Sequence, residues 1–347
     1  MAAGQNRRVT IDDVARQSGV SKTTISRYLN GKYDNISFET RERIREVIKA
    51  LNYRPNRIAQ SLKARNSRLI GCVISDIGSP FSALILKGIN DVCEEADYQV
   101  LFANSDDDPQ REVSAIQGLL ESQVDGLIVN TTGENDDFLV DLHNKGIPLV
   151  LADRALAQPG ILDTVTTDSY TSTYECVRFL KGAGYQQVAF FTQGNKKISP
   201  RLLRYQGYCD AMRDLYQQDG AAGLCEFFID DPTSCLGVLL DFKDKHPGQR
   251  VALLAVNGVA MLHTLNSIQE AGIEMGRDFG VCGFDDWGWA GLISPGITTI
   301  SQDSRLVGCE AARIALDRIS GNRTGEPMLV EFPNRLEVRG STVCENP

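Results

Sequence analysis

Short apolar runs alternate with amphipathic stretches along most of the chain, from residue 68 onward. The runs are RLIGCVISDI, YQVLFANSD, GLIVNTT, IPLVLADR, VAFFTQ, EFFID, VALLAVN and GVCGFDD. Between the first of them lie PFSALILKGINDVCEEA and DPQREVSAIQGLLESQ, which have the apolar spacing of helices. Near-continuous apolar strands separated by helices are typical of buried parallel sheets. Because about 280 residues exceed one such sheet, we predict two α/β lobes with a ligand cleft beyond the carboxyl ends of their strands.

The first 54 residues carry a helical pattern instead. VTIDDVARQSGVSKTTISRYLNG predicts a helix capped by Thr10, a tight turn at Gly19, and a second helix capped by Ser21 and ended by Gly31. After Ser37, FETRERIREVIKALNY places its apolar residues on one face of a third helix. Three short helices around one small core, with glycine in the first turn, match the helix-turn-helix arrangement.

The outward side of the second predicted helix is basic and rich in hydroxyl groups. Lys22 and Thr23 lie in its first turn, the part that reaches base edges in the major groove, and Ser26 and Arg27 follow. Arginine can make paired hydrogen bonds to guanine. The side chains better placed for DNA phosphates are Ser21, Thr24, Asn30 and Lys32. The alternative is a surface helix that happens to be rich in hydroxyls, but serine and threonine are poor helix formers, so DNA binding is favoured.

The charge is divided unevenly along the chain. Residues 1–66 hold 14 Lys and Arg against 6 Asp and Glu, a net charge of +8, and the rest holds 22 against 39, a net charge of −17. A basic head on an acidic body indicates that the head meets a polyanion.

The segment PNRIAQSLKAR, residues 55–65, predicts a short helix. Proline suits the start of a helix, and Ile58 and Leu62 are four residues apart on one face. About ten residues make only a marginal helix in water, so this segment needs something to fold against. Apolar side chains that enter the minor groove between base steps provide one answer, with Leu62 as the wedge. A helical linker whose Leu62 packs on the next domain is the alternative.

The head resembles the DNA-binding headpiece of the LacI/GalR family of bacterial repressors. The matching stretches are VTIDDVA, GVSKTTISRYLNG, TRERI and LNYRPN, followed directly by RIAQSLK. The resemblance implies that Lys22, Thr23 and Arg27 read bases, and that residues 55–66 form a hinge helix that pairs with its dimer mate in the minor groove. Together with the residues named above, it gives further DNA contacts at Thr10, Thr40, Tyr53, Asn56, Arg57, Ala59 and Gln60.

The acidic body, residues 67–347, resembles the periplasmic-binding-protein fold of the same family. The resemblance implies crossings between lobes near Thr167, near 294–298 and near Glu326. The N-lobe would then hold about 68–166 and 298–325, and the C-lobe about 167–297 and 326–341. The complete expected fold is therefore multidomain, an all-α headpiece followed by a two-lobed α/β domain.

The same resemblance implies effector contacts at polar strand ends and at the start of one helix. The residues are Asp76, Phe81, Arg154, Ser199, Arg204, Asn257 and Asp285. Asp153 and Asp168 could instead cap helices, and Arg204 could be a structural ion pair. The chain departs from the family at Gly258, where aspartate is usual.

Lys196, Lys197 and Arg201 add positive charge beside Arg204. Several cations near one cleft favour an anionic effector, a sugar acid of the 2-keto-3-deoxygluconate type or a phosphorylated sugar, over a neutral sugar. A solvated basic loop is the alternative.

Other classes of protein find little support in the sequence. The chain has no apolar run of about 18 residues and no apolar signal core, so we expect a cytoplasmic protein. Nine scattered cysteines without a C-x-x-C pair indicate reduced core thiols, and three distant histidines give no metal-ligand spacing. We find no catalytic motif, and Asp106, Asp107 and Asp108 fit a helix cap better than a carboxylate pair. We therefore expect no enzyme, no metal and no cofactor.

The favoured function is a homodimeric repressor of carbohydrate-use genes that binds a pseudo-palindromic operator and a small-molecule effector. One rival is a regulator gated by a partner protein, as in the catabolite control branch of the family. Another is a sugar-transport binding protein, against which the headpiece argues. A long leucine heptad tail is absent at RGSTVCENP, so a dimer is expected.

Overall fold

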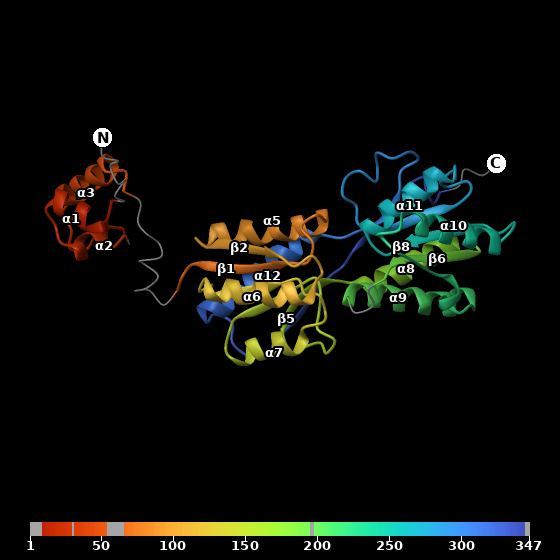
Figure 1. Cartoon of the computed structure of the whole chain (residues 1–347), viewed down its shortest axis with the longest axis horizontal. Helices are drawn as coiled ribbons and strands as arrows, with labels where there is room; N and C mark the ends of the chain where they lie inside the picture. Colours follow the sequence, from red (N-terminus) through yellow and green to blue (C-terminus); the bar gives the residue numbers. More distant parts are fainter. Residues whose placement is uncertain (1–8, 30, 54–65, 195–197, 344–347) are drawn as a thin grey trace, which may run out of the picture. The chain divides into compact units, whose positions relative to one another are not determined.

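A computed structural model describes residues 9–29, 31–53, 66–194 and 198–343. The chain divides into two compact units, Met1–Ser67 and Arg68–Pro347 (Figure 1). The predicted hinge, residues 55–66, lies outside the described residues except for its last residue.

The first unit is a three-helix headpiece. It contains α1 (Ile11–Ser18), α2 (Lys22–Leu29) and α3 (Phe38–Ala50), which pack around a core of Val14, Ala15, Ile25, Ile44 and Tyr53. The helices begin where the sequence predicts. Thr10 and Asp13 form a capping box, and Ser21 and Ser37 accept hydrogen bonds from Thr24 N and Thr40 N. Gly19 ends α1 with φ of 65°, a left-handed conformation that glycine adopts without steric cost.

The N-lobe of the second unit is a parallel sheet between helices. Its strand order is β11-β5-β4-β3-β1-β2. In chain order the strands are β1 (Leu69–Ile74), β2 (Gln99–Asn104), β3 (Gly126–Val129), β4 (Leu149–Ala152), β5 (Asp163–Thr167) and β11 (Leu329–Phe332). One apolar layer joins the sheet to α5 (Pro80–Glu95) and α12 (Ser304–Ser320), and the other joins it to α6 (Pro109–Glu121) and α7 (Asp136–Asn144). Both faces are therefore covered, which explains the unbroken apolar runs of the strands.

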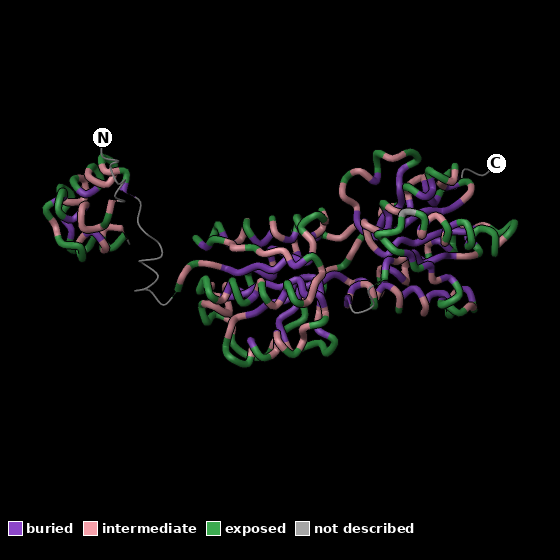
Figure 2. Tube along the Cα trace, viewed as in Figure 1, coloured by how far each residue is buried: buried purple, intermediate pink, exposed green. Residues whose placement is uncertain are grey.

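The C-lobe repeats this plan with the strand order β12-β10-β9-β8-β6-β7. Its strands are β6 (Gln187–Gln193), β7 (Leu224–Phe227), β8 (Val251–Ala255), β9 (Gly280–Phe284), β10 (Thr298–Ser301) and β12 (Arg335–Glu337). Only β12 among these pairs antiparallel, with β10. The helices are α8 (Ser169–Gly182), α9 (Ser199–Ala211), α10 (Pro232–Lys245) and α11 (Gly258–Glu270), with a π-helical turn at Met212–Tyr216 and a 3₁₀ turn at Gly220–Gly223. Figure 2 shows buried strands at the centre of both lobes.

Two of the three expected crossings between the lobes are wrong. The first agrees, because β5 ends at Thr167 and α8 begins at Ser169. The expected crossing near 294–298 falls at 302–303 instead, since β10 still pairs with β9 of the C-lobe. The crossing expected near Glu326 falls at 333–334, because β11 pairs in parallel with β5 of the N-lobe. The short runs TTIS and LVEF fit either sheet, and only hydrogen-bond pairing assigns them.

Two glycines let α5 and α12 approach each other closely. A Cβ atom at Gly88 would lie 2.1 Å from the carbonyl oxygen of Arg305, and one at Gly308 would lie 2.1 Å from that of Ile85. Any side chain at either position would therefore push the backbones of the two helices apart.

Two expectations from composition can be compared with the described residues. The eight described cysteines are free thiols, and seven of them are buried, as the sequence indicated; Cys344 lies outside the described residues. Among the helices of the described residues, none combines the length and apolarity needed to cross a membrane.

Candidate functional site

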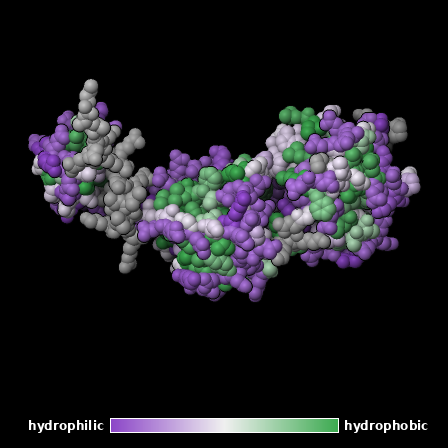
Figure 3. Space-filling view, in the orientation of Figure 1, coloured by the Kyte–Doolittle hydropathy of each residue, from purple (hydrophilic) through white to green (hydrophobic). Residues whose placement is uncertain are grey.

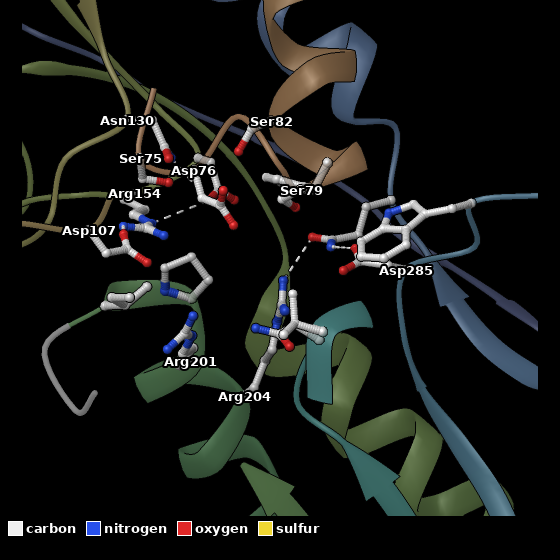
Figure 4. A pocket seen from close by; sticks show the side chains of 18 residues that line it. Ser75, Asp76, Ser79, Ser82, Asp107, Asn130, Arg154, Arg201, Arg204 and Asp285 are labelled. Carbon is white, nitrogen blue, oxygen red and sulfur yellow. Dashed lines mark hydrogen bonds and ion pairs between the residues drawn. The ribbon is translucent and has the colours of Figure 1, made fainter. Parts of the chain in front are cut away.

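A polar pocket lies between the two lobes at the carboxyl ends of their strands (Figure 4). It encloses about 580 Å³ of space not filled by protein atoms, its open mouth included. The N-lobe contributes residues that follow β1, β2, β3 and β4, and the C-lobe contributes residues that follow β8, β9 and β10. Parallel strands of both lobes end here, which brings side chains far apart in sequence into one site.

Arg204, on α9, is a buried residue of the pocket lining. Its Nε donates to Ser169 Oγ (3.2 Å), one terminal nitrogen donates to the carbonyl oxygen of Val256 (2.7 Å), and the other donates to Gln302 Oε1 (2.9 Å). The guanidinium carbon lies 3.7 Å from the centroid of the Phe284 ring. Burial lowers the pKa of Arg204, while the nearby carboxylates oppose that shift. The side chain is fixed in one orientation, and each terminal nitrogen retains a further N–H for a ligand.

Asp153 and Asp285 occupy corresponding positions in the two lobes. Each directly follows a strand, each has a left-handed backbone with φ of 71° and 77°, and each N–H donates to a carbonyl of the neighbouring strand. Burial raises the pKa of both carboxyl groups, with Arg204 acting in the opposite direction on each. Asp285 accepts hydrogen bonds from Gly258 N (2.8 Å) and Gln302 Nε2 (2.6 Å). Left-handed backbone at non-glycine residues is a strained feature that concentrates at binding sites.

Two further arginines line the pocket in different states. Arg154 is paired, since its terminal nitrogen lies 2.6 Å from Asp107 Oδ1 and also donates to the carbonyl oxygen of Thr131. Arg201 is half-buried and makes no hydrogen bond or ion pair with any other described residue. Its guanidinium points toward the Arg154–Asp107 pair in Figure 4. Burial, and next the charge of Arg154, lower the pKa of Arg201 to about 10.

Three helices begin at the pocket wall. Pocket-lining residues come from the capping positions and first turns of α5 (Ser79, Phe81 and Ser82), α9 (Ile198, Pro200 and Arg201) and α11 (Asn257 and Val259). The amino-terminal end of a helix carries unpaired N–H groups and a partial positive charge, so all three ends favour negative charge in the pocket.

Six of the seven predicted effector contacts line this pocket: Asp76, Phe81, Arg154, Arg204, Asn257 and Asp285. Ser199 is the exception. Its hydroxyl accepts a hydrogen bond from Ala155 N (2.8 Å), which joins the C-lobe to the N-lobe. Lys196 and Lys197 lie outside the described residues. Asp168 has the helix-capping role that was its alternative, because its carboxylate accepts a hydrogen bond from Thr171 N at the start of α8.

Several lining residues were missed by sequence reasoning: Ser75, Ser79, Ser82, Asp107, Asn130, Trp287 and Gln302. Most of them follow an apolar strand or open a helix, so the rule that polar strand ends form the site could have found them. Asp153, a strand-end candidate with helix capping as its alternative, lines the pocket as well. In the acidic run 106–108, Asp108 caps α6, as the sequence predicted. Its neighbour Asp107, however, lines the pocket.

The headpiece presents most of its predicted DNA contacts to solvent. Thr10, Ser21, Lys22, Thr23, Arg27 and Lys32 are exposed, and Thr24, Ser26 and Thr40 are half-buried. Lys22 Nζ lies 2.5 Å from Asp12 Oδ1 in an exposed ion pair, which is worth at most about 1 kcal/mol and can open for DNA. Tyr53 differs from the others because it is 9% exposed and belongs to the headpiece core. The predicted contacts Asn30, Asn56, Arg57, Ala59, Gln60 and Leu62 lie outside the described residues.

Comparison with known proteins decides which class this architecture belongs to. Residues 10–56 match the family described as "Bacterial regulatory proteins, lacI family", and residues 67–331 match "Periplasmic binding proteins and sugar binding domain of LacI family". The chain belongs to the LacI family. It is therefore a DNA-binding transcriptional regulator with an effector-binding domain, and the predicted family, fold class and class of function are confirmed.

Individual relatives cover nearly the whole chain. The HTH-type transcriptional regulator KdgR of Bacillus subtilis is 40% identical over 96% of this chain and 97% of that protein. The HTH-type transcriptional regulator PtxS of Pseudomonas aeruginosa is 33% identical over 96% of each. Among solved structures, a lac repressor dimer bound to operator and the anti-inducer ONPF matches with a TM-score of 0.85 and 26% identity, over 97% of this chain and 100% of that one.

Proposed function

We propose that this LacI-family regulator is a homodimeric repressor that is released from its operator when a sugar acid binds between the lobes. The observation that carries the ligand class is Arg201, a half-buried cation that faces the pocket and has no hydrogen-bond or ion-pair partner among the described residues. Removing a charge from water without a partner is costly, so the site is suited to a ligand that brings the opposite charge.

The other charges of the pocket favour a carboxylate over a neutral sugar. Asp107 already pairs with Arg154, and Asp285 accepts two hydrogen bonds, so neither forms a hydrogen bond with Arg201; the charges of Asp107 and Asp153 offset only part of the lowering of its pKa. An arginine guanidinium and a carboxylate can form two parallel hydrogen bonds, and each hydrogen bond to a charged group is worth about 1.5–3 kcal/mol. The three helix amino-terminal ends add to this preference.

The acidic residues of the pocket favour a carboxylate over a phosphate as well. Four aspartates line the site with three arginines. A phosphate ester near neutral pH carries almost twice the charge of a carboxylate and would meet stronger repulsion from these aspartates. A hydroxylated oxo-acid such as 2-keto-3-deoxygluconate combines one carboxylate with hydroxyl groups for the serines and aspartates.

The mechanism couples the pocket to the headpiece through the angle between the lobes. Ligand contacts come from both lobes, so binding favours one arrangement of the lobes and DNA favours another, and the coupling is reciprocal. In the headpiece, Lys22, Thr23 and Arg27 are the proposed base-reading residues. The hinge leucine Leu62 remains the proposed minor-groove wedge.

Dimerisation is supported by apolar side chains that remain exposed in the isolated chain. Figure 3 shows apolar patches on the visible face of both lobes. Among the described residues, Phe102 in the N-lobe is 55% exposed, and Phe228 and Leu292 in the C-lobe are 73% and 84% exposed. Exposed apolar surface of this kind marks contact sites, and two headpieces on one dimer would read the two halves of a pseudo-palindrome.

The test is a thermal-stability screen of the full-length chain against 2-keto-3-deoxygluconate, gluconate, glucose and glucose 6-phosphate. A ligand present at 100 times its dissociation constant adds about 2.7 kcal/mol of stability, which gives a clear shift of the melting temperature. We expect a sugar acid to give this shift in the wild type and in R178M, whose arginine is 63% exposed on α8, and to give none in R201M.

The same acid should lower the affinity of the chain for an operator selected in vitro from random DNA. An equal shift with glucose, or an unchanged shift in R201M, would overturn the anionic ligand class. An acid that tightens operator binding would overturn the proposed release.

A further inference from the structure

Trp287 and Gly258 fit each other in the C-lobe wall of the pocket. Gly258 is the first residue of α11 and follows the capping residue Asn257, whereas Trp287 lies on the segment after β9. A Cβ atom at position 258 would lie 2.2 Å from Cη2 and 2.5 Å from Cζ2 of the Trp287 indole. Because real Cβ contacts are never this short, the indole occupies the volume that a side chain at position 258 would need.

Packing, more than hydrogen bonding, holds this ring in place. The Trp287 Nε1 atom is buried and has no hydrogen-bond partner among the described residues. Besides Gly258, the ring meets Trp289 edge to face, with 6.3 Å between ring centroids and an interplanar angle of 67°. A tryptophan kept in a polar pocket without using its donor indicates that the apolar ring is the useful part.

The lack of a side chain at position 258 also affects the charge of the wall. Gly258 brings no side chain to the wall, and its N–H donates to Asp285 Oδ2. A carboxylate at position 258 would add a fifth acidic group to a pocket that four aspartates already line. The indole instead gives the wall an uncharged surface, at a position next to the proposed ligand contact Asn257.

We propose that Trp287 is a specificity-determining residue, whose ring supports the C–H face of a carboxylated polyol, and that Gly258 is its necessary partner. This inference rests on the proposed function for the charge of the ligand. Phe81 is the only other aromatic side chain among the described residues that line the pocket, and it comes from the opposite lobe. An aromatic surface gives the ligand apolar contact without charge. Because position 258 carries no carboxylate, it does not repel an anionic ligand.

The closing experiment measures dissociation constants by calorimetry for 2-keto-3-deoxygluconate and for glucose with full-length variants. W287L should bind the acid at least about 10-fold more weakly, and W287F should recover part of the loss because it keeps a ring. W289F is the matched control, since Trp289 lies outside the pocket lining and phenylalanine keeps an aromatic ring against Trp287, and it should stay within about 3-fold of the wild type. G258D should weaken acid binding by about 100-fold, because it adds both overlap and charge.

The double variant G258D/W287A separates overlap from charge. It restores room for the aspartate side chain, and we expect its preference to move from the acid toward glucose. Acid binding by G258D/W287A as tight as that of W287A would overturn the charge argument. If wild-type protein binds glucose in place of the acid, the anionic ligand class of the proposed function fails. W287L is then judged against glucose, where a change under about 3-fold overturns the role of Trp287 and a larger loss supports it.

Discussion

Replacing Gln302 by methionine should destabilise the C-lobe by about 3 kcal/mol. The Gln302 side chain accepts hydrogen bonds from Thr167 Oγ1 (2.7 Å) and Arg204 (2.9 Å) and donates one to Asp285 Oδ1 (2.6 Å). It follows β10 at one crossing between the lobes, and Thr167 ends β5 at another. One amide therefore ties two crossings to two buried charged residues of the pocket.

The magnitude follows from what Q302M leaves unpaired. The two bonds to charged groups are worth about 1.5–3 kcal/mol each, and the bond to Thr167 about 0.5–1.5 kcal/mol. The three bonds share one side chain and are not additive, and Arg204 and Asp285 still attract each other, so the expected loss lies near the lower end of the sum. Methionine preserves the volume of the side chain, so the loss reports hydrogen bonds more than packing.

Intrinsic fluorescence provides the assay. The chain has two tryptophans, Trp287 and Trp289, and both belong to the C-lobe, so their emission follows the unfolding of this lobe in the intact protein. With a urea dependence of about 3 kcal/mol per molar, a loss of about 3 kcal/mol lowers the unfolding midpoint by about 1 M. Q249M is the control, because Gln249 makes an exposed side-chain hydrogen bond to Gln187 and should shift the midpoint little. A Q302M midpoint equal to that of Q249M would refute the argument.

Three further changes test other parts of the structure. G308A should destabilise the N-lobe by about 1–3 kcal/mol in calorimetric melting, because its Cβ would lie 2.1 Å from the Ile85 carbonyl oxygen. This overlap should outweigh the better helix propensity of alanine, and a stabilised variant would contradict the close approach of the two helices. R318M should lower the stability of the fold by about 3–5 kcal/mol in the same assay, because the carboxylate of Asp163, which is 3% exposed, loses its two hydrogen bonds from the guanidinium. R313M is the control, since Arg313 belongs to an exposed ion pair on the same helix. Equal losses in the two variants would count against a stabilising buried pair. D153N should flatten the pH dependence of stability, since burial raises the folded-state pKa of Asp153 above its unfolded value, so that its stabilising contribution is present at low pH and is lost as pH rises through the raised pKa. Melting temperatures from about pH 4 to 8 check this, and parallel curves for wild type and D153N would show that Asp153 does not titrate in that range.

Local chemistry made much of this protein predictable from its sequence. Apolar runs locate the buried strands because a strand covered on both faces needs apolar side chains at every position. Helix starts in the headpiece are visible as Thr10, Ser21 and Ser37, since capping involves residues only three apart. The candidate ligand contact Asp285 directly follows a strand that the apolar pattern marks, whereas Arg204 was predicted from the resemblance to the family.

Tertiary structure alone decided the features that depend on distant partners. The residues at 298–301 and 329–332 do not reveal which sheet they join, and only pairing with β9 and β5 assigns them to their lobes. Ser199 and Arg201 begin the same helix, yet the hydroxyl joins the other lobe while the guanidinium faces the pocket. The contact between Gly258 and Trp287 joins positions 29 residues apart. Residue type and spacing determine local structure, but which side chains meet, and which remain without a partner, is determined by strand order and by how the two lobes close on each other.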